Sequence, residues 1–271
     1  MRADLHVHTT ASDGSFPPKA VVEKAKEAGM AAIAITDHDT VEGVQEAVAA
    51  GLGAGIEVLP GIELGADYEG IEVHILGYCI DIENSELLEK LSWLRRARME
   101  RIERMVEKIR KMGIPVEMEE VLAIAGIGSV GRPHLAKAMV AAGAVKSTAE
   151  AFEKFIGAGR LAYVARQKLR PAEAIELVRG AGGLAVLAHP GLGGAGKLFY
   201  SLAGAGLGGV EVYHPSHSWE ESLYYRMLAA GWDLVATGGS DYHGPGHKSG
   251  WQIGLKSVSY ETVNEIKRRI G

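Results

Sequence analysis

The chain opens with Asp4-Leu5-His6-Val7-His8-Thr9 (DLHVHT), part of an apolar, strand-like stretch at about 2–7 that ends in two histidines. Residues i and i+2 of a strand point to the same face, so both imidazoles can reach a single ion. Most of the chain's other short apolar runs are rich in Val, Ile and Leu, which predicts parallel strands buried on both faces. These runs lie at about 31–36, 57–64, 71–78, 184–188, 208–213 and 233–237.

Helical patterns separate most of these runs, at about 17–28, 41–50, 171–180, 219–230 and 261–269. Alternation of strand and helix indicates βαβ units and hence an α/β fold. The turn Asp67-Tyr68-Glu69-Gly70 is short enough to join the third and fourth strands as a hairpin instead.

The alternation stops near residue 82 and resumes near residue 168. Between these points the sequence predicts helices only, at about 85–112, 117–125, 132–142 and 148–157. We therefore expect a barrel domain made of 1–81 and 168–271, with a helical subdomain, 82–167, inserted on one loop. Loops grafted on barrels commonly carry specificity. The glycine-rich stretch 191–196 lacks the Lys-Ser/Thr of a phosphate loop, and a flexible loop is expected there.

The composition excludes several classes of protein. The chain has 271 residues, 47% hydrophobic and 23% charged, so disorder is not expected. Its net charge of −5 argues against a duplex-DNA binder, which needs a broad basic face. One cysteine, Cys79, excludes an intramolecular disulfide framework and a cysteine-based zinc cluster. No apolar run of about 18 residues and no signal-peptide pattern occurs, so we expect a cytoplasmic location and no membrane association.

Almost every predicted strand carries a side chain near its end that can bind a metal. Asp13 follows the first strand in a Ser-Asp-Gly turn, and His38 follows the second. The carboxyl ends of parallel barrel strands meet at one face, so such side chains should converge on one pocket. Cations would offset the cost of burying them together. The remaining strands supply Glu63, His74, His189, His214, Asp241 and His243.

Each of these residues has an ordinary structural explanation when it is taken alone. A histidine pair on one strand is commonly a surface feature, and Asp13 fits a turn former. Asp37 or Asp39 fits a helix cap, and His74 fits a hydrogen-bonded core histidine. Taken together these explanations are less convincing, because a metal-binding residue near the end of all seven strands is unlikely to arise by chance.

Imidazole and carboxylate ligands without thiolate suit Mn²⁺, Zn²⁺ or Fe²⁺. Six histidines and three carboxylates are enough to hold three divalent ions, with Glu63 bridging two of them. Clustered ions bind a phosphoryl oxygen, generate hydroxide at neutral pH and stabilise the leaving oxygen. The sequence therefore predicts metal-dependent hydrolysis of a phosphate ester.

With these residues in place, the whole chain resembles the PHP (polymerase and histidinol phosphatase) family of metallophosphoesterases. The resemblance implies a distorted (β/α)7 barrel, which agrees with the seven predicted strands. Gly131-Arg132-Pro133-His134 in the insertion resembles the subgroup that hydrolyses nucleoside 3′,5′-bisphosphates and trims RNA 5′ ends, so a small phosphorylated nucleotide or an RNA 5′ end is the expected partner. The motifs that carry the resemblance are DLHVHT, SDG, TDHD, PGIEL, VHILGY, AHP, VYHPSH and GGSDYHG.

The resemblance also implies how the ligands divide among three metal sites. The nucleophile would be a hydroxide that bridges metal ions, so no separate general base is required. Ala165 stands where related chains tend to have proline, a departure in a loop. The implied sets are His6, His8, Glu63 and Asp241; then Glu63, His74 and His189; then Asp13, His38 and His243.

Four further residues are candidates for the site. His214 and His217 are expected to support the metal ligands or the leaving group, or else to bond within their own loop. Arg132 and His134 begin a helix, where free N–H groups and a guanidinium form a phosphate site. We expect this pair to anchor the phosphate that is not cleaved, and the alternative for Arg132 is a solvated helix face.

Two other functions stay open. A metal-dependent amidohydrolase that cleaves C–N bonds also begins with a His-x-His strand, but it does not explain Arg132, His134 or the set built on Asp13. A non-catalytic, metal-bound scaffold is opposed by the complete ligand set. The sequence predicts neither the native metal, nor the choice between monoester and RNA phosphodiester, nor the base, nor the oligomeric state.

Overall fold

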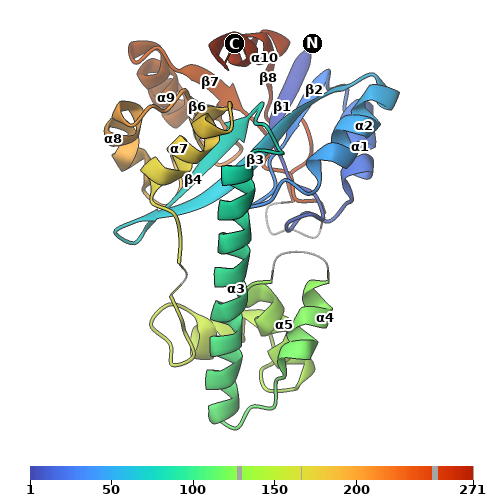
Figure 1. Cartoon of the computed structure of the whole chain (residues 1–271), viewed down its shortest axis with the longest axis vertical. Helices are drawn as coiled ribbons and strands as arrows, with labels where there is room; N and C mark the ends of the chain where they lie inside the picture. Colours follow the sequence, from blue (N-terminus) through green and yellow to red (C-terminus); the bar gives the residue numbers. More distant parts are fainter. Residues whose placement is uncertain (127–129, 166, 246–249, 271) are drawn as a thin grey trace. The chain divides into compact units, whose positions relative to one another are not determined.

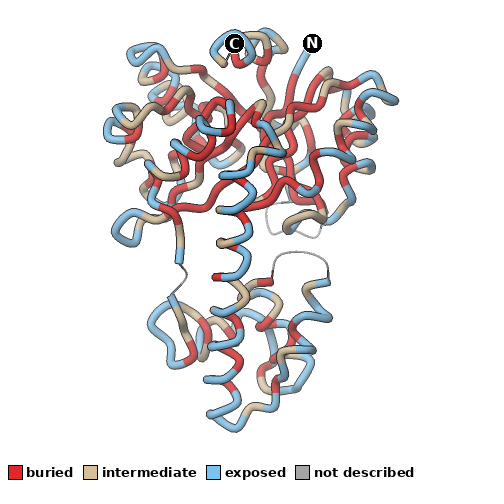
Figure 2. Tube along the Cα trace, in the orientation of Figure 1, coloured by how far each residue is buried: buried red, intermediate tan, exposed pale blue. Residues whose placement is uncertain are grey.

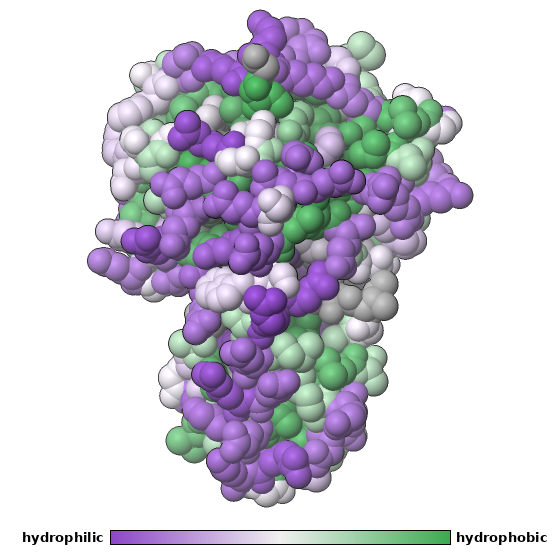
Figure 3. Space-filling model, viewed as in Figure 1, coloured by the Kyte–Doolittle hydropathy of each residue, from purple (hydrophilic) through white to green (hydrophobic). Residues whose placement is uncertain are grey.

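The computed structural model describes residues 1–126, 130–165, 167–245 and 250–270. The chain divides into two compact units. The barrel unit comprises Met1–Lys90 and Lys168–Gly271, and the helical unit comprises Leu91–Gln167. Hydrophilic residues cover most of the face that Figure 3 shows. Within the described ranges, no helix is both long and apolar enough to cross a bilayer.

The described part of the barrel unit contains one eight-stranded sheet with the order β7-β6-β5-β4-β3-β2-β1-β8 (Figure 1). The strands are almost entirely buried (Figure 2). Beyond β7 the chain returns to β1, where His8 N donates to Tyr242 O at 2.9 Å, so the sheet nearly closes into a barrel. The strands are β1 (Arg2–Val7), β2 (Ala32–Ile35), β3 (Glu57–Tyr68), β4 (Ile71–Tyr78), β5 (Leu184–Leu187), β6 (Gly209–Tyr213), β7 (Val235–Gly238) and β8 (Val258–Ser259).

The parallel arrangement expected for most strands does not extend to β4. β1–β2, β2–β3, β5–β6 and β6–β7 are parallel, whereas β4 runs against both β3 and β5. The hairpin that the short turn allows is therefore confirmed. Glu69 and Gly70 have φ angles of 50° and 86°, as a two-residue type I′ turn requires. Because β4 is reversed, His74 enters the site from the middle of a strand rather than from its end.

The predicted barrel with surrounding helices is confirmed, with eight strands in place of seven. β8 has only two residues, too few for a periodic pattern, and pairs antiparallel with β1. The five helices predicted for this unit are present, and α7 has the predicted bounds. The loop expected at the glycine-rich stretch 191–196 ends in a 3₁₀ turn at Ala195–Leu198, and helix α8, which was not predicted, follows. The helices are α1 (Pro18–Glu27), α2 (Val44–Ala54), α7 (Pro171–Gly180), α8 (Phe199–Gly204), α9 (Trp219–Gly231) and α10 (Tyr260–Ile270).

A β-bulge in β1 sets the direction of its histidines. The pairing with β2 advances three residues on β1, from Asp4 to Val7, but only two on β2. Leu5 shares a buried cluster with Leu76. Leu76 is the cross-strand partner of Glu63 and so faces the same side as Glu63. The extra residue thus lets Leu5 fill the barrel core while the next residue, His6, also reaches Glu63.

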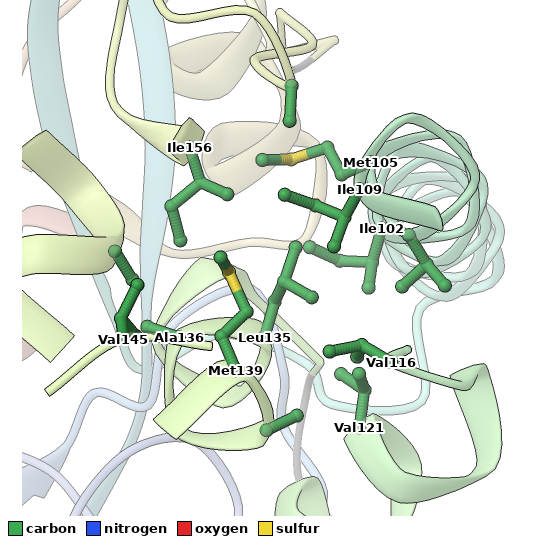
Figure 4. Packing of buried hydrophobic residues seen from close by; sticks show 14 of the residues in the cluster. Ile102, Met105, Ile109, Val116, Val121, Leu135, Ala136, Met139, Val145 and Ile156 are labelled. Carbon is green, nitrogen blue, oxygen red and sulfur yellow. The ribbon is translucent and has the colours of Figure 1, made fainter. Parts of the chain in front are cut away.

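The helical unit builds its own core. The inner face of α3 repeats at Ile102, Met105 and Ile109, the spacing of a helix stripe, and packs with Leu135 and Met139 of α5 (Figure 4). The helix predicted at 148–157 forms as α6 and continues as a π-helical turn. The elements are α3 (Ser85–Lys111), α4 (Met118–Ala125), α5 (Arg132–Ala141), α6 (Thr148–Ala151) and the turn Phe152–Ile156.

Candidate metal centre

Glu63 of β3 stands at the centre of the histidine cluster, with its side chain buried. Its Oε1 lies 2.7 Å from His74 Nδ1 and 3.0 Å from His189 Nε2. A carboxylate that faces imidazoles through both oxygens has the geometry to bridge two cations. Its Oε2 lies 3.0 Å, 3.2 Å and 3.3 Å from ring nitrogens of His38, His6 and His8.

Two aspartates join the cluster from loops. Asp241, which follows β7, places Oδ1 3.2 Å from His8 Nε2 and 3.4 Å from His6 Nε2. Asp13, which follows β1, places Oδ1 3.3 Å from His243 Nε2. Each of the three carboxylates in the cluster therefore faces at least one imidazole.

The donor atoms form three groups, and within each group all donors lie within 4.8 Å of one another. The first coincides with a set that the family resemblance implies. In the second, His38 stands where the resemblance implies His189, although His189 also contacts Glu63. The third adds His8 to the expected set. The groups are His6, His8, Glu63 and Asp241; His38, Glu63 and His74; and His8, Asp13, His38 and His243.

The cluster fits divalent cations on two observations. Both ring nitrogens of His8 are buried and have no hydrogen-bond partner in the described part of the chain, although buried polar atoms are normally bonded. The ring nitrogens of His6 and His8 also lie 3.2–3.4 Å from carboxylate oxygens of Glu63 and Asp241. That spacing is close to the roughly 3.4 Å edge of a tetrahedron with ~2.1 Å metal–ligand bonds.

The electrostatics of the cluster favour positive charge. Burial alone would raise the pKa of Glu63, but the imidazoles of His38 and His6 outweigh burial and hold that pKa well below its usual range. Burial would lower the pKa of His8, but Asp241 and Glu63 raise it to about 10. Burial would also lower the pKa of His74, but Glu63 raises it to about 9. The carboxylates thus stabilise positive charge at His8 and His74, whereas burial lowers the pKa of His38 to about 4.

Glu211 is a member of the site that sequence reasoning missed. It lies buried on β6, where Oε1 is 2.9 Å from His6 Nδ1 and Oε2 accepts from His189 N at 2.8 Å. The first contact turns His6 Nε2 toward Glu63, and the second holds His189 at its unusual φ of 25°. The sequence does contain a signal for Glu211, which is an acidic residue inside the apolar run Val210-Glu211-Val212. A charge buried in a strand needs a partner, so Glu211 could have been expected to bond to a cation or a histidine.

Asp37 positions the loop that carries Asp13. Its carboxylate accepts from Thr9 N and Thr9 Oγ1, each at 2.7 Å, and from Ser12 Oγ at 2.6 Å. It therefore ties the loop after β1 to the end of β2, instead of serving as the helix cap that its position also allowed.

His214 and His217 have different environments. His214 Nδ1 accepts from Ser216 N at 3.2 Å, so its proton is on Nε2, which lies 3.4 Å from Asp241 Oδ2. His217 donates from Nδ1 to Val212 O at 2.9 Å and accepts at Nε2 from Gly191 N at 3.1 Å. His214 thus contacts a predicted ligand, whereas both ring nitrogens of His217 bond to backbone.

Arg132 and His134 lie in the helical unit, in the first turn of α5. His134 Nδ1 accepts from Gly131 N at 3.0 Å, which caps the helix. The guanidinium carbon of Arg132 lies 5.4 Å from the ring centroid of Phe152 and 5.8 Å from that of Tyr163. These cation–π contacts orient the Arg132 side chain.

The chain is similar to proteins of known family. The family model described as "PHP domain" matches residues 4–112. The chain is 34% identical to the 5′-3′ exoribonuclease Rnm of Escherichia coli (strain K12), over 89% of this chain and 85% of that protein. It is also 34% identical to a 3′,5′-nucleoside bisphosphate phosphatase of Chromobacterium violaceum, over 98% of this chain and 97% of the relative.

A solved structure shares the fold across nearly the whole chain. A protein of Bifidobacterium adolescentis, assigned as a metal-dependent phosphoesterase, superposes with a TM-score of 0.86. The two chains are 34% identical, and the match covers 98% of this chain and 96% of the other.

Proposed function

The chain belongs to the PHP family of metal-dependent phosphoesterases, and on that premise we propose that it hydrolyses nucleoside 3′,5′-bisphosphates and trims short RNA from the 5′ end. Its relatives bear the names of a bisphosphate phosphatase and a 5′-3′ exoribonuclease, and the chain spans most of both. The observation that carries the proposal is Glu63, whose two carboxylate oxygens face five imidazoles in a buried cluster.

The nine residues predicted from the sequence are the proposed ligands of three divalent ions, Mn²⁺, Zn²⁺ or Fe²⁺. Bound ions would supply the charge that holds phosphoryl oxygens and the acidity that makes hydroxide available at neutral pH. Glu63 presents Oε1 to one set of histidines and Oε2 to another, which supports its role as the shared ligand. Glu211 and His214 orient His6 and Asp241 through hydrogen bonds.

For Arg132 and His134 the proposed role is to hold the phosphate that is not cleaved. The first turn of α5 is the positive end of the helix dipole, which favours an anion. The Phe152 and Tyr163 rings limit the motion of the Arg132 guanidinium, which lowers the entropy cost of binding a phosphate. His134, as the cap, keeps that first turn formed.

The test is phosphate release by the Mn²⁺-loaded protein from adenosine 3′,5′-bisphosphate, with 5′-AMP and a short 5′-phosphorylated RNA alongside. Glu63→Gln keeps the shape of the side chain but removes its charge, and we expect it to lower phosphate release at least 100-fold. Glu265→Gln, on the outer helix α10, is the control and should leave the rate unchanged. Wild-type protein that binds metal but hydrolyses none of the three compounds would contradict the proposal.

A further inference from the structure

A pocket outside the metal cluster combines an exposed aromatic ring with two cationic side chains. It has a volume of about 240 Å³ and lies between the end of β6 and the start of α9. We call it the α9 pocket; it is lined by Leu223 and by Tyr213, Ser218, Trp219, Ser222, Arg226 and Lys256.

The charges of the α9 pocket are not neutralised by neighbours. Among the described residues, neither Arg226 nor Lys256 has an ion pair or a side-chain hydrogen bond. The carboxylates nearest in sequence, Glu220 and Glu221, are engaged at the helix cap, where Ser218 Oγ and Ser218 N donate to them at 2.8 Å each. Glu220 and Glu221 keep their negative charge, but neither pairs with Arg226 or Lys256, so both cations are available to a phosphate.

Trp219 is free to stack with a ligand. Its side chain is 73% exposed although tryptophan is among the most apolar residues, and it is not among the ring–ring contacts of the described residues. An exposed ring beside two unpaired cations is the usual arrangement for a nucleotide of a single strand, with the base on the ring and the phosphates on the cations.

The α9 pocket lies within reach of the metal cluster along the chain. Tyr213, which lines it, is followed directly by His214, whose Nε2 contacts Asp241. Trp219 follows His214 by five residues, which span at most roughly 18 Å. A strand whose first nucleotide lies at the metal cluster could thus place a later nucleotide on Trp219.

We propose that the α9 pocket binds a nucleotide of single-stranded RNA downstream of the reacting 5′ end. This inference rests on the proposed function and extends it, because it names the feature that favours a short RNA over a mononucleotide. Trp219 would stack on a base, and Arg226 with Lys256 would contact the phosphates that flank it.

Binding tests the proposal separately from hydrolysis. A short 5′-phosphorylated RNA with a 3′ fluorophore is titrated with metal-free protein in EDTA, and the anisotropy gives Kd. We expect Trp219→Ala to weaken binding about tenfold, since base–aromatic stacking contributes ~1–3 kcal/mol. Trp219→Phe should restore most of the affinity. The Arg226→Gln/Lys256→Gln double variant should weaken binding and reduce the salt slope by about 1.4.

Tyr224→Ala is the matched control, because Tyr224 is an exposed ring on the same helix that does not line the pocket. It should leave Kd unchanged. In the Mn²⁺-loaded protein, Trp219→Ala should lower the rate of RNA trimming about tenfold more than the rate of adenosine 3′,5′-bisphosphate hydrolysis. Its melting temperature should equal that of wild type. Three outcomes would overturn the proposal. Wild type and Trp219→Ala could have the same Kd, Tyr224→Ala could lose as much affinity as Trp219→Ala, or no form of the protein could bind the RNA. If the wild-type protein binds RNA in a way that depends on Trp219 but hydrolyses none of the substrates, only the proposed function is overturned.

Discussion

At the scale of single residues, the site depends on carboxylates with distinct tasks. Glu63 faces the ring nitrogens of five histidines, whereas Glu211 bonds to the far nitrogen of His6 and to the backbone of His189. Glu211 therefore fixes which His6 nitrogen is available as a ligand. Partners of this kind commonly change metal affinity without touching the metal.

Glu211→Gln should weaken metal binding about 10- to 100-fold. The amide keeps the volume but loses the charge that orients His6 and His189. A competition titration with a chromophoric chelator gives the affinity, and activity should recover at high Mn²⁺. Glu265→Gln serves as the control, and an unchanged metal affinity for Glu211→Gln would show that His6 is oriented by other contacts.

Metal loading should release protons. In metal-free protein the pKa of His8 is raised to about 10 and that of His74 to about 9, so both are protonated at pH 7.5. A histidine must be neutral to bind a metal, so apparent affinity should rise with pH until these groups are deprotonated. Calorimetric titrations in two buffers of different ionisation enthalpy measure the release. We expect at least two protons, because the carboxylates of Glu211 and Glu63 also raise the pKa of His6. The number should fall by about one in His8→Asn, and no release would contradict this account.

At the scale of elements, two local irregularities bring His6 and His74 to the same carboxylate. The bulge in β1 turns His6 toward Glu63, and the hairpin reverses β4 so that His74 lies across from Gly65, two residues from Glu63 on β3. Both depend on backbone geometry more than on side-chain pattern. The hairpin turn offers a direct measurement.

Gly70→Ala should lower the free energy of unfolding by about 1–2 kcal/mol, because its φ of 86° is unfavourable for a residue with a Cβ. Beyond Gly70 and its two chain neighbours, no atom lies within 4 Å of the added Cβ, so a clash with the rest of the structure does not contribute. Urea unfolding measures the change. Gly53→Ala, in helix α2 with equally open space, should be neutral or stabilising by up to ~1 kcal/mol. Equal effects at the two glycines would refute the turn assignment.

The start of α5 carries the prediction for substrate binding. Arg132→Ala should raise KM for adenosine 3′,5′-bisphosphate about tenfold or more, since a hydrogen bond to a charged group contributes ~1.5–3 kcal/mol. KM for a simple phosphate monoester should change much less, because such a substrate lacks the second phosphate. Arg104→Ala, which removes an exposed side chain paired with Glu100, is the control. An equal rise in KM for both substrates would rule out the anchor.

At the scale of the whole molecule, every proposed metal ligand belongs to the barrel unit, while the helical unit has a separate core. The ligands come from β1, β3, β4 and the loops after β1, β2, β5 and β7. Bound ions would therefore stabilise the barrel unit by joining segments far apart in the chain.

Removal of metal by EDTA should lower the stability of the barrel unit by about 3–4 kcal/mol when the metal was present at 100–1,000 times its Kd. Amide hydrogen exchange resolves the two units. Exchange should accelerate in β1, β3 and β4, whereas α5 should change little because its contacts are within the helical core. Equal acceleration in both units would contradict the assignment of metal binding to the barrel unit alone.

The sequence predicted much of the fold and the set of side chains that meet. The strand and helix positions followed from periodicity, and α7 has its predicted bounds. The nine predicted ligands lie in one cluster, although their assignment to individual ions stays a prediction. Strand β8 and helix α8 were missed, because two or six residues carry too little periodic signal.

The sequence by itself determined the α/β class, the strand-end histidines and carboxylates, and the family, because these depend on local spacing and residue chemistry. Only the tertiary structure decided that Glu211 pairs with His6, 205 positions away, and that Arg132 contacts the rings of Phe152 and Tyr163. It also decided that a bulge redirects His6. These contacts arise from strand register and chain packing, which bring together residues whose separation in sequence carries no periodic signal.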